Sequence, residues 1–170
     1  MPKMVKKLSR KQTILIDSRE QLPLPFPGTV VVDGTRYSLT GKVVTRHEGD
    51  YALKGYEDCC IVERKYSARE LLKNLFDPKD GKRQAKALTR LCSACELPVL
   101  VLEATPALLL RPSRGVKDPS GLPLGLVRML HRFDNLHLVF APTFGSARNR
   151  QLTGELVASL LIASAILLRT

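Results

Sequence analysis

The sequence predicts an α/β domain with a mixed central β-sheet flanked by helices, and two observations carry this prediction. Short runs of apolar or β-branched residues, each of strand length, recur before residue 66, at 13–16, 30–32, 36–39, 43–46, 51–54 and 59–62. After residue 66, helical patterns alternate with uniformly apolar runs at 99–102 and 136–140, which is typical of buried parallel strands. With 170 residues, 44% of them hydrophobic, the chain has enough apolar material for a single core.

The first strand, at residues 13–16, is expected to follow a basic flexible arm that comprises residues 1–12. It ends in Asp17-Ser18-Arg19-Glu20, and open α/β sheets place their functional sites at the carboxyl ends of such strands. The simpler interpretation of these charges is a helix cap with a solvated ion pair. Residues 22–28 contain three prolines and are expected to be extended, and residues 30–39 are predicted to form a hairpin that turns at Asp33-Gly34.

The stretch from His47 to Glu70 carries the strongest functional signal. An apolar run from Cys59 to Val62 ends in Glu63-Arg64-Lys65, and Asp50 opens the strand before it. Acidic side chains at the edge of a buried strand cost desolvation free energy unless a cation compensates them. Mg²⁺ or Mn²⁺ would do so, because hard cations bind carboxylate oxygens. Lys65 shares a strand face with Glu63, so it is placed to orient or deprotonate a water on that metal.

After Lys65 the pattern becomes helical. Ser67 is predicted to cap a helix that Asp77-Pro78 stops, and a second helix is expected to begin near Lys82. Residues 111–123, rich in Gly, Pro and charge, are expected to form a mobile loop. A helix at 124–133, a buried strand at 136–140 and a final helix at 147–168 complete the prediction.

These residues resemble the nuclease domain of the XPF family, the structure-specific DNA endonucleases named for xeroderma pigmentosum group F. The family signature is Gly-Asp, a spacer and then Glu-Arg-Lys-x-x-x-Asp, and Gly49-Asp50 and Glu63-Arg64-Lys65 match it. The closing Asp is absent, because Arg69 occupies its position with Glu70 beside it. A second block agrees, since the family's first strand likewise ends in an Asp-x-Arg-Glu motif like that at residues 17–20.

The resemblance implies a restriction-endonuclease-like fold for residues 13–170. It implies a Mg²⁺- or Mn²⁺-dependent DNA endonuclease that hydrolyses phosphodiester bonds in branched or junction DNA, such as flaps, forks and Holliday junctions, in DNA repair or recombination. Asp50, Glu63 and the backbone carbonyl of Arg64 would bind the metal, with Asp17 as a further acid for a water or a second metal. Lys65 would act on the attacking water, and the Arg19 and Arg64 side chains would hold phosphate.

The net charge of +11, with a pI of about 9.8, favours an anionic polymer as partner. The simplest alternative is a basic protein without such a partner, and the nuclease-like motif favours DNA over it. Candidate DNA contacts lie beside the site, on the second helix and in the loop at 111–123: Arg19, Glu20, Arg83, Lys86, Arg90, Arg114 and Lys117. The alternatives are a solvated helix face and a plain connecting loop.

The cysteines and the chain termini bear on location. The four cysteines, without secretory context, are expected to be reduced and buried, and a zinc site at Cys92-x-x-Cys95 lacks good partners because Cys59 and Cys60 are adjacent on a strand. The N-terminus has no signal-peptide-like stretch, and the apolar C-terminal segment is short for a membrane span. We therefore expect a cytoplasmic (nucleoid) or nuclear protein that is neither secreted nor membrane-bound.

The final helix is apolar nearly all round, which indicates burial against more than one surface. XPF-family nuclease domains pair through this C-terminal region. The resemblance therefore implies a homodimer or a heterodimer, with Leu156, Leu160 and Ile166 at the interface. The alternative is a helix wholly buried within one domain. Family members usually carry a helix-hairpin-helix domain after the nuclease, and because its repeats are not evident here we expect a stand-alone nuclease domain.

Two alternative functions stay open. The first is a catalytically inactive, nuclease-fold DNA-binding subunit of a heterodimer, which Arg69 in place of the acid favours. Retention of Asp17, Asp50, Glu63 and Lys65 argues against it, because these charged groups are costly to desolvate together. The second is a sequence-specific restriction-type endonuclease on the same fold, which cleavage of unbranched duplex at fixed sites would favour.

Overall fold

The computed structural model describes residues 8–112 and 116–169. The seven strands that it describes form one mixed sheet in the order β2-β3-β1-β4-β5-β6-β7. The predicted α/β fold, with helices that flank a mixed sheet, is therefore confirmed. In chain order, the elements are β1 (Lys11–Asp17), β2 (Thr29–Val32), β3 (Thr35–Val44), β4 (Tyr51–Leu53), β5 (Cys60–Lys65), α1 (Ala68–Phe76), α2 (Pro78–Ala94), β6 (Leu97–Leu102), α3 (Pro106–Leu110), α4 (Leu122–Arg132), β7 (His137–Phe140) and α5 (Ala147–Arg169).

The strand directions bring the ends of three strands together at one end of the sheet. β5, β6 and β7 are parallel, and helices lie between them in the chain. β4 is antiparallel to both of its neighbours, β1 and β5, and β1 is parallel to β3. The ends of β1 and β5 and the start of β4 therefore meet. Their junction is closed by backbone hydrogen bonds from Asp17 N to Asp50 O (2.9 Å) and from Asp50 N to Val62 O (2.8 Å).

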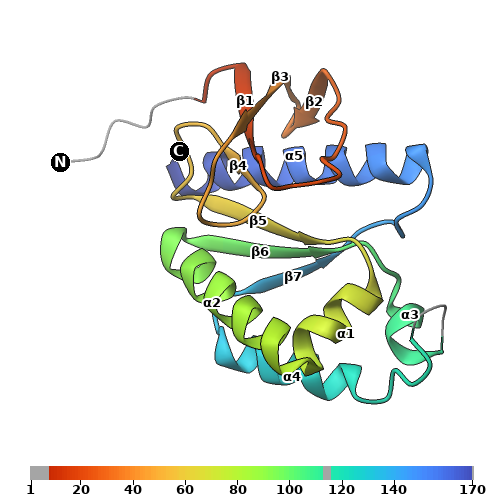
Figure 1. Ribbon diagram of the computed structural model, residues 1–170. Helices are drawn as coiled ribbons and strands as arrows, with labels where there is room; N and C mark the ends of the chain where they lie inside the picture. The colour runs from red at the N-terminus through yellow and green to blue at the C-terminus, as the bar shows by residue number, and fades with distance from the viewer. Residues whose placement is uncertain (1–7, 113–115, 170) are drawn as a thin grey trace.

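Helices cover the two faces of the sheet unequally (Figure 1). α5 packs on β2, β4 and β5 on one face, where residues such as Val62 and Leu161 form one buried core. α1 and α2 pack on β5 and β6 on the other face, with α4 beside α1, and residues such as Ile61 and Leu100 form a second core. On that second face the alternate side chains of β3 from Arg36 to Lys42 are exposed.

The helix boundaries follow from their caps. Ser67 caps α1 as predicted, since its Oγ accepts a hydrogen bond from Glu70 N at 3.1 Å. The prediction that α2 begins near Lys82 was wrong, because α2 begins at Pro78. Asp77 is its N-cap, and its Oδ1 accepts hydrogen bonds from Lys79 N and Asp80 N at 2.9 Å each. Proline is tolerated at position 78 because the first N–H groups of a helix have no partner within the helix. The dipeptide that stops one helix also starts the next.

The strands differ from prediction in two places. The run at 36–39 and the first two residues of the run at 43–46 form one strand, β3, because its ladder with β1 continues unbroken from Ser38 to Val44, and residues 45 and 46 lie beyond its end. β7 is less buried than predicted, with His137 and Phe140 exposed, because it lies at the edge of the sheet. The hairpin prediction is confirmed, and its turn has φ of 48° at Asp33 and 68° at Gly34, as a type I′ turn requires.

The final helix, α5, is mainly a core helix. At Gly154 an added Cβ would lie 2.1 Å from the carbonyl oxygen of Pro25, so glycine lets the proline-rich segment close onto the helix. Of the predicted dimer residues, Leu156 and Ile166 pack partly buried against this core and Leu160 is half-buried, so their role in a dimer stays a prediction. By length and composition α5 is also apolar enough to cross a membrane, a test that buried core helices pass as well.

The start of the chain bears on the predicted arm. Leu8 is buried and β1 begins at Lys11, so the described part of residues 1–12 packs onto the domain. Residues 1–7 of the predicted arm lie outside the described residues.

Candidate active site

An open cavity of about 800 Å³ lies where β1 and β5 end and β4 begins. Carboxylates of Asp17, Asp50 and Glu63 line it, together with those of Glu20, Glu70 and Asp80, and Asp80 pairs with Lys73 and Arg83. Cationic side chains from the β1 end and from α1 and α2 also line it: Arg19, Arg69, Lys73, Arg83 and Arg90. An acidic centre surrounded by cations suits a metal-bound phosphodiester, because the acids hold the cation and the outer cations attract the phosphate backbone.

Gly49 places Asp50 in this cavity. Its φ is +57°, in the left-handed region that favours glycine, and an added Cβ would lie 2.5 Å from Cγ2 of Ile61 and 3.0 Å from the carbonyl oxygen of Val62. Only a residue without a side chain lets the chain approach β5 this closely before it enters β4. The Gly-Asp motif therefore has a packing reason as well as a chemical one.

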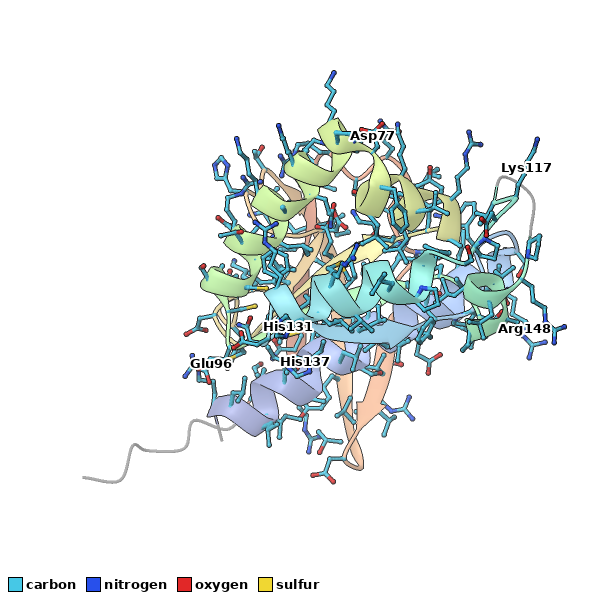
Figure 2. The ribbon with its side chains drawn as sticks, turned by 90° about the horizontal axis from the view of Figure 1, so that it is seen from below. Asp77, Glu96, Lys117, His131, His137 and Arg148 are labelled. Atoms are coloured by element: carbon cyan, nitrogen blue, oxygen red, sulfur yellow. The ribbon has the colours of Figure 1, made fainter. Side chains whose placement is uncertain are left out.

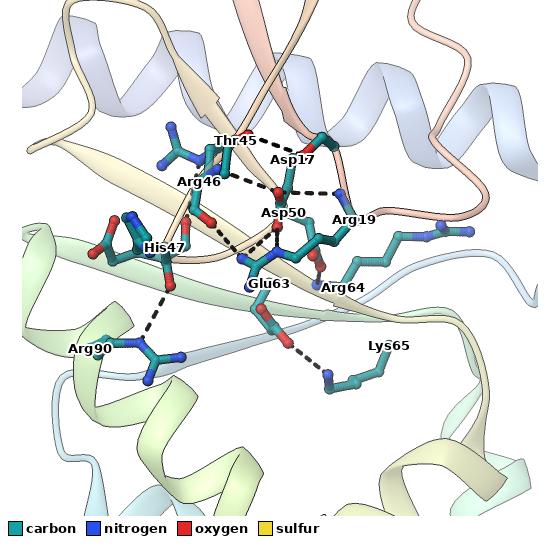
Figure 3. Close-up of polar contacts among 12 residues, drawn as sticks. Asp17, Arg19, Thr45, Arg46, His47, Asp50, Glu63, Arg64, Lys65 and Arg90 are labelled. Carbon is teal, nitrogen blue, oxygen red and sulfur yellow. Dashed lines mark hydrogen bonds and ion pairs between the residues drawn. The ribbon is translucent and has the colours of Figure 1, made fainter.

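Asp50 and Glu63 form the acidic centre of the site (Figure 3). Burial, followed by the negative charge of Glu63, raises the pKa of Asp50 well above its usual value, although the Arg64 backbone N–H donates to Asp50 Oδ2 at 2.7 Å. Two neighbouring carboxylates repel each other when both are ionised, and a cation between them relieves this repulsion. The pair has the donor chemistry that Mg²⁺ or Mn²⁺ requires.

Lys65 lies on the same face as Glu63 and connects two acids. Its Nζ lies 2.6 Å from Glu63 Oε1 and 3.7 Å from Glu70 Oε1. Burial lowers the pKa of Lys65, but the charges of Glu63 and Glu70 outweigh it, so the pKa is raised. A lysine with a raised pKa retains its proton at neutral pH. The two roles predicted for Lys65, orienting the attacking water and deprotonating it, stay predictions.

Asp17 lies at the end of β1 with Arg19. Arg19 Nε donates to Asp17 Oδ2 at 2.9 Å, and the Arg46 backbone N–H donates to Oδ1 at 3.4 Å. Burial alone would raise the pKa of Asp17, but these hydrogen bonds outweigh it and lower the pKa. Asp17 is therefore an ionised carboxylate beside the Asp50–Glu63 pair (Figure 3). The Arg19 side chain stays 63% exposed, which leaves it accessible to a phosphate.

Arg64 points away from the cavity. Its guanidinium forms ion pairs with Glu103 and, at 3.5 Å, with Glu20 at the cavity wall, donates to the carbonyl oxygen of Leu22 at 2.8 Å and lies over the ring of Phe144. The side chain is 1% exposed. The phosphate-binding role expected for this side chain does not fit this position, because the group is buried and already paired. The metal-binding role expected for its backbone carbonyl is unaffected and stays a prediction.

The predicted DNA contacts divide by position. Glu20, Arg83 and Arg90 line the cavity with Arg19, and Arg90 Nε donates to the His47 carbonyl oxygen at 3.4 Å. Lys86 lies on α2 outside the cavity lining. Lys117 is exposed between α3 and α4 and extends outward at the edge of the molecule (Figure 2). Arg114 lies outside the described residues.

Sequence analysis did not identify several residues that lie in or beside the cavity as parts of the site. Glu103, which pairs with Arg64, directly follows β6, and a charge at the carboxyl end of a buried strand was the available signal. Arg69 and Lys73 line the cavity four residues apart on α1, where helical spacing places them on one face. Glu70 proves to be a partner of Lys65, so one carboxylate stands near the position of the absent Asp.

The described residues supply only a few candidate ligands for a metal ion. Among the residues that the structure describes, no group of three or more His, Cys, Asp and Glu side chains is placed to hold a metal ion. The Asp50–Glu63 pair supplies two carboxylates, and a third protein ligand would have to come from the backbone. Because Mg²⁺ commonly keeps several waters and takes only one or two carboxylates, this donor set fits it.

Comparison with solved structures gives two matches. XPF from Aeropyrum pernix has a TM-score of 0.60 and 20% sequence identity, with 89% of this chain and 61% of that chain covered. The fold is that of XPF. XPF from Aeropyrum pernix in complex with DNA matches with a TM-score of 0.59 and 20% identity, over 91% of this chain and 65% of that chain. The predicted XPF-like, restriction-endonuclease-like fold is thereby confirmed.

The comparisons also set the limits of the likeness. No family model matches the chain, and no curated protein matches it by sequence. The chain spans less than two thirds of the XPF chains it matches. At 20% identity the likeness to XPF concerns the fold, and the chemistry has to be argued from the residues of this chain.

Proposed function

We propose that this protein is a Mg²⁺- or Mn²⁺-dependent DNA endonuclease that hydrolyses phosphodiester bonds in branched or junction DNA. The observation that carries the proposal is the Asp50–Glu63 pair, two adjacent carboxylates with Lys65 bonded to one of them, in a cavity surrounded by cations. A buried arrangement of this kind is electrostatically unfavourable by itself and becomes favourable when a divalent cation occupies it.

Each residue has a distinct role in this proposal. Asp50, Glu63 and the Arg64 carbonyl hold the metal, which when bound acidifies a water and polarises the phosphate. Lys65, held by Glu63 and Glu70, directs the attacking water toward phosphorus through its ammonium N–H groups. Asp17 accepts a hydrogen bond from that water or supports a second metal. Arg19 holds the non-bridging phosphate oxygens, because its exposed guanidinium is fixed at one end by Asp17.

The DNA partner is supported by charge and by shape. The net charge of +11 is distributed over a chain whose cavity is lined by five cationic side chains besides Lys65, named above. XPF from Aeropyrum pernix, the protein with the matching fold, has been solved in complex with DNA. Preference for branched over linear DNA rests on the XPF likeness alone.

A second candidate function is an inactive DNA-binding subunit. It is favoured by Arg69, a cation at the position where the family signature has an acid, and by the ion pair that already engages Glu63. The same cavity would then bind the DNA backbone without cutting it. This candidate and the enzyme differ in one measurable respect, which is metal-dependent cleavage.

The test uses end-labelled flap, fork, Holliday-junction and linear duplex DNA with Mg²⁺, Mn²⁺ or chelator. Asp50→Asn and Glu63→Gln are compared with Asp33→Asn, a matched change at an exposed hairpin turn whose positive φ asparagine also adopts. We expect wild type and Asp33→Asn to cut branched DNA with metal. We expect both site variants to lose at least about 10²-fold in rate, as removal of a metal ligand implies.

Each outcome decides between the candidates. Binding of branched DNA without cleavage under any metal would overturn the enzyme and establish the binding subunit. Cleavage that survives in Asp50→Asn and Glu63→Gln would place the catalytic site elsewhere. Cleavage of unbranched duplex at fixed sequences would replace the junction substrate by a restriction-type one.

A further inference from the structure

One part of the sheet surface is covered by none of the helices of residues 8–112 and 116–169. α5 packs on the opposite face, and α1 and α2 pack farther along the sheet, on β5 and β6 (Figure 1). On β3, the side chains of Arg36, Ser38, Thr40 and Lys42 point to this face and are all exposed. On β1 it carries exposed Lys11 and partly exposed Thr13. We name these six side chains the open face.

The open face is positively charged and rich in hydroxyl groups. In the β1–β3 register Lys11 is paired with Ser38, Thr13 with Thr40 and Leu15 with Lys42, so a cation lies on each side of the central pair of threonines, whose hydroxyl oxygens are 3.2 Å apart. Within β1, β2 and β3, all of which the structure describes, Asp17 is the single acidic residue. Lys11, Arg36 and Lys42 form no ion pair with any described residue.

The open face leads to the candidate active site. Residues two apart on a strand share a face, so Lys11 and Thr13 lie on the same side of β1 as Asp17. With a rise of about 3.3 Å per residue, Thr13 lies roughly 13 Å and Lys11 roughly 20 Å from Asp17 along the strand. Leu15 lies between Asp17 and Thr13 on this side of β1 and is buried, and its neighbour on β3 is the exposed Lys42. A polyanion that reaches the cavity can therefore continue past Lys42 to the threonines and Lys11.

We propose that the open face binds the sugar-phosphate backbone of the DNA segment that leads away from the cavity. This inference rests on the proposed function and extends it to a second surface. Lysine and arginine neutralise phosphates, and serine and threonine hydroxyls donate to phosphate oxygens. Half-exposed sheets often present a solvated polar face. The open face differs from such a face in three respects. Its three cations form no ion pair with a described residue, none of its exposed side chains is acidic, and it adjoins the cavity.

The test is the salt dependence of DNA binding by the whole chain in chelator, where no cleavage interferes. The variant Lys11→Thr/Arg36→Thr/Lys42→Thr removes the three cations with a residue that suits strands. The control Arg128→Gln/Arg132→Gln/Arg148→Gln removes three exposed cations from other surfaces and has the same net charge. Fork DNA is titrated at several salt concentrations, and circular dichroism with thermal melting verifies that both variants fold.

We expect the open-face variant to bind more weakly and to lose about 2 to 3 from the magnitude of the slope of log K against log salt, at about 0.9 for each phosphate contact. We expect the control to keep the wild-type slope. Equal slopes for the two variants would overturn the inference and leave a solvated face. The proposed function fails separately, because it is decided by metal-dependent cleavage at saturating DNA, in which the open-face variant keeps Asp50 and Glu63.

Discussion

Two charged clusters lie side by side at the end of β5, and the alternation of side chains along the strand separates them. Glu63 and Lys65 face the cavity, whereas Arg64 faces the α5 side of the sheet and pairs there with Glu103. The Arg64 and Glu103 side chains are 1% and 0% exposed, and those of Lys65 and Glu63 are 8% and 14% exposed. The Glu-Arg-Lys motif thus contributes to two environments on opposite faces of one strand. We call Arg64 and Glu103 the sealed cluster, and Asp50, Glu63 and Lys65 the open cluster.

The difference between the clusters is one of charge balance. The sealed cluster pairs Arg64 with the Glu103 carboxylate and, at 3.5 Å, with that of Glu20, and the guanidinium also contacts the Leu22 carbonyl oxygen and the Phe144 ring. The open cluster places Asp50 and Glu63 together, with the pKa of Asp50 raised by burial and by its neighbour. The charges of the first cluster are paired within the protein, although Arg64 Nη2 and Glu103 Oε2 have no hydrogen-bond partner among the described residues. The second cluster would be stabilised by a bound cation. We therefore expect the sealed cluster to serve the fold and the open cluster to hold the proposed metal.

The largest effect is expected from breaking the sealed cluster on one side. Arg64→Met leaves the Glu103 carboxylate buried and unpaired, which costs roughly 3–5 kcal/mol of the free energy of unfolding. Urea denaturation measures this cost. The double variant Arg64→Met/Glu103→Leu removes both charges and is expected to recover most of the loss, because an apolar pair of similar volume replaces a buried ion pair at little cost.

The same variants test whether the Arg64 side chain binds phosphate. If its side chain held phosphate, the double variant would bind DNA with a reduced salt slope even though it folds. We expect the slope to stay at the wild-type value. A reduced slope in a stable double variant would contradict the separation of the two clusters, and so would a single variant that loses less than about 1 kcal/mol.

A smaller effect on stability, of opposite sign, is expected in the open cluster. In chelator, Asp50→Asn should melt above wild type, because it removes one of two repelling carboxylates. With Mn²⁺ at 100 times its Kd, wild type should gain about 2.7 kcal/mol, or roughly 5–10 °C in Tm, and Asp50→Asn should gain little. Thermal melts with and without metal measure both shifts. Equal metal shifts in the two proteins would contradict metal binding at Asp50.

The sequence predicted the fold and the centre of the site because both depend on local patterns. Strand-length apolar runs gave the strands, and Gly49-Asp50 with Glu63-Arg64-Lys65 gave the acidic centre. The phosphate-binding role expected for the Arg64 side chain does not fit its position, and strand alternation already places that side chain opposite Glu63 and Lys65. The sequence did not reveal that the opposite side is buried, because the partner Glu103 follows β6, 39 residues farther along the chain.

Other features depended on contacts that no local pattern encodes. Asp77 was interpreted as a helix stop because Pro78 follows it, whereas its carboxylate caps the next helix. The exposure of β7 follows from its place at the edge of the sheet, and strand order is a property of the whole fold. The position of Glu70 beside Lys65 depends on the turn from β5 into α1, where Tyr66 N donates to Glu70 Oε2 at 3.1 Å.

The smallest effect is expected from Glu70, which stands beside the position of the absent acid. Glu70→Gln keeps an amide oxygen that accepts from Tyr66 N but removes the charge facing Lys65. We expect kcat for cleavage to fall roughly three- to tenfold with KM for DNA unchanged, because Lys65 is then held by Glu63 alone. The matched control is Glu155→Gln, at an exposed position on α5.

A compensating variant decides whether Glu70 positions Lys65 or only caps α1. Arg69→Asp/Glu70→Gln moves the carboxylate to the position of the family acid, so a positioning role predicts recovery of kcat toward wild type. A capping role alone predicts instead that Glu70→Gln, which keeps the oxygen accepting from Tyr66 N, leaves both Tm and kcat near the wild-type values. Recovery would join Glu70 to the open cluster as its outermost member, and its absence would restrict the cluster to Asp50, Glu63 and Lys65.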